Sequence, residues 1–132
     1  MAHIKPECHL WGKTFSPFKL SELNQKLELR IANEPGEFGT IGKYKNRSTP
    51  YGACSNTTPE DIENSNRINW MEDLIAQNLN LLRETGATEI NYWLYWMGLQ
   101  ANMEFSPNQI KKISDLGIYF CIDYIQENVN SI

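Results

Sequence analysis

The spacing of apolar residues predicts three helices in this chain of 132 residues. The longest is expected over about residues 68–85, where apolar side chains recur at helical spacing and Gly86 ends the helix. Two shorter helices are expected after Ser16-Pro17 and after Ser106-Pro107, because serine caps a helix and proline fits its first turn. The apolar stripe of the long helix is Ile68, Met71, Ile75, Leu79 and Leu82, widened by Leu74 and Leu81.

Strands are predicted where apolar and polar residues alternate, or where aromatic and β-branched residues gather. The stretch 89–105 is expected as one long strand or as a hairpin bent near Gly98. Residues 46–67 have the weakest pattern and are predicted to form a long loop with one helical turn near Thr58. The other predicted strands are 7–15, 27–32, 118–125 and a short, lysine-bearing edge strand at 39–45.

A near-repeat connects these elements into a fold. Residues 14–23 (TFSPFKLSEL) and 104–113 (EFSPNQIKKI) each place Phe-Ser-Pro before an amphipathic helix that lies between two predicted strands. Parallel strands need such a crossover. The sequence therefore predicts one α+β domain over residues 1–132, a ferredoxin-like sandwich of a mixed sheet with helices mainly on one face. The repeat itself arises either from duplication or from convergent helix capping.

Charge and composition narrow the function. The net charge is −4, from 12 basic and 16 acidic residues, which argues against nucleic-acid binding. The acidic excess lies in residues 48–132, which predicts either a basic partner or an ordinary solvated surface. The sequence contains neither an apolar leader-like run nor a membrane-span-length stretch, so a cytoplasmic location without membrane contact is expected. Cys8 and Cys121 are expected to be reduced core residues.

The search for catalytic chemistry points away from an enzyme. Cys8 and His9 are adjacent, so on a strand they face opposite sides and form no metal site. The acid pairs Glu60/Asp61 and Glu72/Asp73 occupy predicted helix starts, where the helix dipole favours acids, and Asn69 with Glu72 predicts a capping box. Neither a glycine-rich phosphate loop nor a metal-ligand spacing is found. We therefore expect no enzymatic activity, no cofactor and no metal.

The stretch NYWLYWMG, residues 91–98, is the most informative one for binding. On a strand, Trp93 and Tyr95 share one face with Met97, whereas Trp96 lies on the other face with Tyr92. With helices on one face of the sheet, one of these sets is either exposed as an interface or covered by residues 33–67. Stacking of RNA bases on sheet aromatics is disfavoured because the basic signature of that module is absent.

The order of features resembles a bacterial family, "domain of unknown function 4279". The residues that carry the resemblance are FSPFKLSEL, the long helix ending at Leu82, and FSPNQIKKISDLGIYFCIDY, which ends at Tyr124. They span most of residues 7–125 and are packing motifs, so the resemblance implies a fold and no catalytic residues. More loosely, the chain resembles in type the small, acidic immunity proteins of bacterial toxin systems.

The leading hypothesis is a non-enzymatic inhibitor, an immunity protein that binds a basic toxin domain and is itself a monomer or homodimer. The alternative is a small-molecule-binding or enzymatic domain, with a pocket near the 46–67 loop lined by Tyr44, Tyr51, Trp70 and Cys54. A third hypothesis is a dimeric structural module that self-associates through Trp93 and Tyr95. For the leading hypothesis, the predicted partner-binding residues are Glu60, Asp61, Glu63, Trp93, Tyr95 and Trp96.

Overall fold

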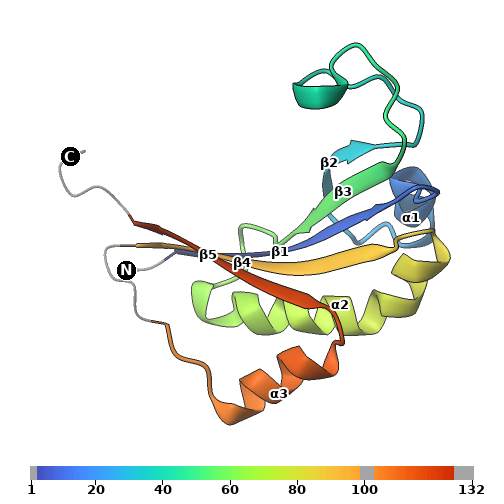
Figure 1. Ribbon diagram of the computed structural model, residues 1–132. Coiled ribbons are helices and arrows are strands. Elements are labelled where there is room, and N and C mark those ends of the chain that lie inside the picture. Colours follow the sequence, from blue (N-terminus) through green and yellow to red (C-terminus); the bar gives the residue numbers. More distant parts are fainter. Residues whose placement is uncertain (1–2, 99–102, 127–132) are drawn as a thin grey trace.

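The computed structural model describes residues 3–98 and 103–126, which form five strands and three α-helices (Figure 1). Two short 3-10 helices, Gly42–Tyr44 and Asn64–Asn66, lie in the connections. The main elements are β1 (His3–Gly12), α1 (Pro17–Leu23), β2 (Leu29–Asn33), β3 (Gly52–Thr57), α2 (Arg67–Glu84), β4 (Glu89–Gly98), α3 (Pro107–Asp115) and β5 (Tyr119–Gln126).

The strands form one mixed sheet in the order β2-β3-β1-β4-β5. β1 is antiparallel to both β3 and β4, β2 is antiparallel to β3, and β4 is parallel to β5. The first four strands with α1 and α2 have the ferredoxin-like order, and α3 adds β5 as a fifth strand. Helices α2 and α3 lie on the same side of the sheet (Figure 1). The predicted α+β, ferredoxin-like fold is therefore confirmed.

The region between β2 and β3 differs from the prediction. Residues 52–57, expected within a long loop, form β3, which inserts between β1 and β2. The edge strand expected at 39–45 does not form. The β2–β3 connection contains the 3-10 helix Gly42–Tyr44 and two isolated bridges instead. β3 was missed because its sequence, GACSNT, has no large apolar side chain, and its strand state depends on its neighbours in the sheet.

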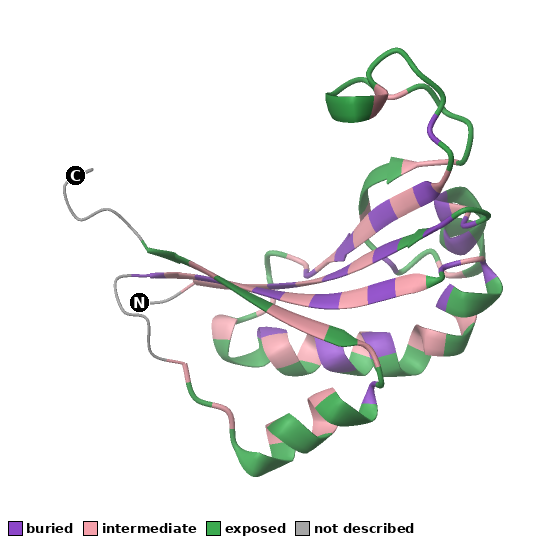
Figure 2. Cartoon of the chain, viewed as in Figure 1, coloured by how far each residue is buried: buried purple, intermediate pink, exposed green. Residues whose placement is uncertain are grey.

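The core lies between the sheet and α2. Tyr92 of β4 and Met71 and Ile75 of α2 are fully buried there, and Leu20 brings α1 into the same cluster. Strand residues alternate between buried and half-buried along β1, β3 and β4 (Figure 2). The alternation shows which side of the sheet α2 covers, and Met71, Ile75 and Leu82 of the predicted apolar stripe are buried against it.

The three cysteines are free and fall into two environments. Cys8 and Cys54 are buried on the helix-covered face, where burial raises the pKa of both thiols to about 12. Cys121 is half-buried and lies opposite Trp93 on the other face, so its expected place in the core was wrong.

The two Phe-Ser-Pro copies both cap helices. Ser16 Oγ accepts a hydrogen bond from the Lys19 amide, and Ser106 Oγ accepts one from the Gln109 amide. Ser106 also forms a full capping box, because Gln109 Oε1 accepts the Ser106 N–H at 2.9 Å. The capping box predicted at Asn69 is absent, since α2 already begins at Arg67 and Asn69 lies inside it.

Replacing the α3 cap is expected to lower stability measurably. Ser106→Ala removes the acceptor for the Gln109 amide, which costs about 1 kcal/mol in the free energy of unfolding. Ser106→Asp keeps an acceptor and should restore most of the loss. Chemical denaturation measures the effect, and Ser114→Ala, an exposed serine later in the same helix, is the control. Equal losses for Ser106→Ala and Ser114→Ala would contradict the capping role.

Candidate functional site

The sheet has one face without a helical cover in the part of the chain that the structure describes (Figures 1 and 2). We call this the open face. Strand alternation places Glu7 and His9 of β1 there, together with Trp93 and Tyr95 of β4. All four side chains are half-buried rather than buried. The open face thus presents aromatic side chains on a rigid sheet.

Three rings on the open face pack against one another, and we call them the aromatic row: His9, Trp93 and Tyr95. The His9 and Trp93 rings stack with centroids 5.6 Å apart and planes at 25°, and the Trp93 and Tyr95 rings stack at 5.7 Å and 14°. The β1–β4 register explains the contact with His9, because His9 lies opposite Asn91 and therefore diagonally next to Trp93 on the same face. The rings are therefore ordered by one another as well as by the sheet.

Charged groups lie beside the rings of the aromatic row. Glu7 Oε1 lies 3.0 Å from His9 Nε2, so the carboxylate holds the imidazole ring in its stacked position. Burial raises the pKa of Tyr95, and negative charge on Glu7 and Asp123 adds to the shift. The Tyr95 phenol is accordingly a hydrogen-bond donor at neutral pH. The site can offer flat apolar surface together with a few fixed polar groups.

A second aromatic cluster lies at the other end of β1. The Tyr51 ring is 5.3 Å from Trp11, and the Tyr44 ring meets Tyr51 edge-on at 5.8 Å. Tyr44 and Tyr51 belong to the β2–β3 connection, which projects beyond the sheet (Figure 1). This connection packs on Trp11, whereas the neighbours of Trp93 are His9 and Tyr95. Of the alternative cover, residues 33–67, the tyrosines of the β2–β3 connection thus pack on Trp11 instead of on Trp93.

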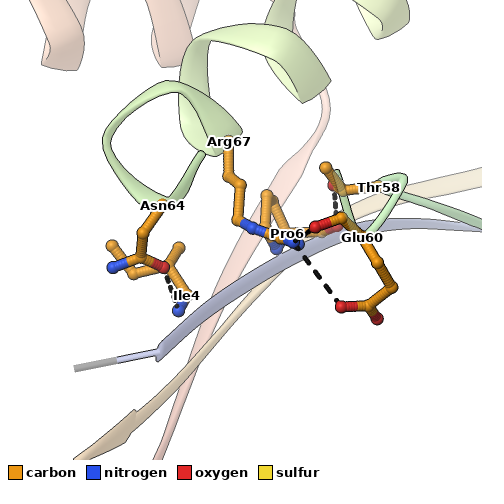
Figure 3. Close-up of polar contacts among 6 residues, drawn as sticks. All are labelled: Ile4, Pro6, Thr58, Glu60, Asn64 and Arg67. Atoms are coloured by element: carbon orange, nitrogen blue, oxygen red, sulfur yellow. Dashed lines mark hydrogen bonds and ion pairs between the residues drawn. The ribbon is translucent and has the colours of Figure 1, made fainter. Parts of the chain in front are cut away.

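The segment 58–67 is anchored to the beginning of β1 by side chains (Figure 3). Asn64 Oδ1 accepts the Ile4 N–H at 2.9 Å, and Thr58 Oγ1 donates to the Pro6 carbonyl at 2.8 Å. These bonds are needed because β3 pairs with β1 only as far as Glu7, which leaves the earlier β1 residues without a strand on that side.

Buried Arg67 fixes the shape of this segment. Its Nη2 donates to the Glu60 carbonyl at 3.0 Å and lies 3.6 Å from Glu60 Oε2 (Figure 3). A polar cavity of about 280 Å³ adjoins the anchor. Its walls include Lys5, Glu7 and Glu60. Glu7 lies opposite Trp93 in the β1–β4 ladder, so the cavity connects Glu60 to the open face. Asp61 and Glu63 are exposed on the same segment.

The structure divides the predicted partner-binding residues. Trp93 and Tyr95 lie on the open face, and Glu60 approaches that face through the shared cavity. Trp96 lies on the opposite face, buried, with its ring edge-on to Tyr124 at 5.6 Å. Its prediction as a contact residue is therefore corrected to a packing role. Sequence reasoning missed His9 and Glu7, which become recognisable only through the β1–β4 register.

The pocket predicted from Tyr44, Tyr51, Trp70 and Cys54 does not form. Cys54 faces the core, Trp70 belongs to α2 on the helix-covered side, and the two tyrosines pack at the end of the sheet. The cavity beside Glu60 is lined by a different set of residues.

The described chain shows neither a metal cluster nor a membrane helix. Within residues 3–98 and 103–126, no three His, Cys, Asp or Glu side chains gather closely enough to hold a metal ion. In the same ranges, no helix is long and apolar enough to cross a membrane. No family model, curated protein or solved structure matches the chain. The resemblance to the bacterial family named above therefore stays a prediction.

Proposed function

We propose that this protein is a non-enzymatic inhibitor that docks a partner protein, a basic bacterial toxin domain, on the open face of its sheet. The observation that carries the proposal is the aromatic row, stacked and half-exposed on a face that no described helix covers. Tryptophan and tyrosine supply large contact areas at low entropic cost and are the commonest hot-spot residues. Their mutual stacking lowers the ordering cost further.

The charges near the aromatic row favour a basic partner. Glu7 lies on the open face, and Glu60, Asp61 and Glu63 follow on the anchored segment, so the acids outnumber the solvent-accessible cations there, Lys5 and Arg30. Exposed acids at the rim of an interface accelerate capture of a cationic partner and make the association rate depend on salt. This charge distribution supports a toxin domain with a basic surface, such as a nuclease, over an acidic partner.

The test begins with candidate toxin domains encoded by neighbouring genes. Each is purified as an inactive variant and titrated against this protein by calorimetry at low and high salt. The proposal expects one stoichiometric complex, protection of cells that express the active toxin, and slower association at high salt. Absence of binding to every basic candidate, with the protein folded, would overturn the proposal.

Trp93→Ala is expected to weaken such a complex by about 2 kcal/mol, roughly thirtyfold in Kd, because it removes the ring that stacks on both His9 and Tyr95. Phe18→Ala is the matched control, since Phe18 is an exposed aromatic on α1, away from the open face. Calorimetry measures both, and thermal melting verifies folding. Unchanged affinity for Trp93→Ala, or equal weakening by Phe18→Ala, would exclude the open face as the docking surface.

A small-molecule site is the second candidate, and the polar cavity beside Glu60 favours it. The cavity of about 280 Å³ includes the Thr57 side chain, whose buried Oγ1 has no hydrogen-bond partner among the described residues. A ligand there should raise the melting temperature, since binding at one hundred times Kd adds about 2.7 kcal/mol. A ligand screen by melting shift, with Arg30→Ala as the cavity variant, separates this candidate from protein docking.

A further inference from the structure

The two edges of the sheet are built differently. The β2 edge is short and irregular, because its pairing register shifts between Arg30 and Asn33 and Ile31 has a positive φ of 54°. Such irregularity protects an edge from pairing with another chain. The β5 edge has neither a register shift nor a residue with positive φ. It pairs with β4 without a break from Tyr119 to Gln126, and this stretch contains neither proline nor lysine.

The β5 edge also exposes apolar side chains on both faces. Tyr119 is 74% exposed, Ile122 51% and Ile125 47%. The register with β4 places Tyr119 and Ile125 on the open face and Ile122 on the helix-covered face. On that same side, Ile110 of α3 is also exposed. A long, regular and apolar edge of this kind is a template for another strand.

We propose that β5 pairs antiparallel with β5 of a second copy of this chain, with Ile122 facing Ile122 of that copy. The two five-stranded sheets then join into one of ten strands. Paired residues must share a face, so only registers that shift by an even number of residues are allowed. The inference does not depend on the proposed toxin partner.

Side-chain chemistry selects this register among the allowed ones. Centred on Ile122, the pairing places each Tyr119 opposite an Ile125, each Phe120 opposite a Tyr124, and each Asp123 opposite a Cys121. A shift of two residues one way would place Asp123 opposite Asp123, where like charges repel. The same shift the other way would place Tyr119 opposite Asp123. The strand is therefore self-complementary in one register.

Ile122 permits a test of both the edge and the register. Because the residue faces its own copy, Ile122→Lys brings two positive charges together and Ile122→Glu brings two negative charges together. Each variant alone should raise the dimer dissociation constant at least tenfold, whereas an equimolar mixture should form a heterodimer. Ile41→Lys is the matched control, since Ile41 is 82% exposed in the β2–β3 connection.

Sedimentation velocity with the full chain alone, over a wide concentration range, measures these masses. The wild type and Ile41→Lys are expected to move from 15.3 kDa toward twice that mass as concentration rises. Circular dichroism confirms that each variant is folded. A wild type that stays monomeric throughout overturns the proposal, as does a dimer unaffected by Ile122→Lys. Dimer loss without rescue in the mixture overturns the register. Because no toxin partner is present in this experiment, its result tests the dimer alone and does not bear on the proposed function.

Discussion

Gly52→Ala is expected to destabilise the fold by about 3 kcal/mol or more, because a side chain there would collide with the backbone. A Cβ atom at Gly52 would lie 1.8 Å from the Phe15 carbonyl oxygen and 2.9 Å from its carbonyl carbon. Both atoms are backbone, and the Phe15 side chain is fully buried, so the neighbour cannot move aside cheaply. Urea denaturation of the two proteins measures the difference.

Gly36→Ala is the control that separates collision from backbone strain. Gly36 has a φ of 88°, yet nothing lies within 4 Å of where its Cβ would stand. Alanine there should cost only about 1 kcal/mol, from the left-handed backbone alone. If the Gly52→Ala and Gly36→Ala unfolding curves coincided, the close approach of Phe15 to β3 would be contradicted.

The first Phe-Ser-Pro copy lies where the chain after β1 meets two other parts of the fold, and Gly52 is one of the contacts there. After β1, the chain passes between the start of β3 and the turn from α2 to β4. A Cβ at Gly12 would lie 2.2 Å from the Gly86 carbonyl oxygen. The Ser16 amide donates to the Thr85 carbonyl at 3.1 Å. This copy therefore holds α1 against two other elements, whereas the structure of the second copy is largely a local helix cap.

The elements that could be predicted are those whose signal is local. α2 was recognisable because five apolar residues repeat at helical spacing over its length, and α1 and α3 because Ser-Pro begins each. β3 was not recognisable, because its small side chains are buried by β1 and β2, which are distant in sequence. The predicted strand at 39–45 failed for a local reason, since positive φ at Gly42 and Asn46 turns the chain there.

The candidate site was predictable only in part. Alternation alone separates Trp93 and Tyr95 from Trp96, and the structure has the same division. Which set the helices cover depends on how the crossovers connect the strands, and this is a property of the whole fold. The contact of His9 with the β4 aromatics depends on the β1–β4 register, which brings together two strands that are far apart in the sequence.

Glu72 was predicted to be an ordinary helix-start acid, and the structure contradicts this. Its side chain is fully buried in α2 at the sheet, where the Tyr92 hydroxyl donates to Oε2 at 3.4 Å. Lys112 of α3 brings Nζ to 3.9 Å from Glu72 Oε1 and 2.7 Å from Asp73 Oδ1. Burial raises the pKa of the Glu72 carboxyl, while Lys112 and the Tyr92 hydrogen bond oppose the shift.

This arrangement makes the stability of the wild type depend on pH. The folded chain holds the Glu72 proton to a higher pH than the unfolded chain, whose carboxyl titrates near 4.5. At lower pH the carboxyl is protonated in both states, so no charge has to be buried there. As pH rises through the folded-state pKa, the charged form must be buried, and this contribution lowers the free energy of unfolding. Glu72→Gln should remove that slope.

Tyr92 substitutions should have large effects that reveal this linkage. Tyr92→Ala leaves a cavity and is expected to cost about 3–5 kcal/mol. Tyr92→Phe keeps the ring and costs about 1–3 kcal/mol by leaving the buried Glu72 oxygen without its donor. The cost of Tyr92→Phe should grow as pH rises through the folded-state pKa of Glu72, which lies above 4.5, because the lost bond favours the charged carboxylate. Denaturation at several pH values, repeated in the Glu72→Gln background, measures this. A pH-dependent Tyr92→Phe cost that persisted beside Glu72→Gln would show that another group is responsible.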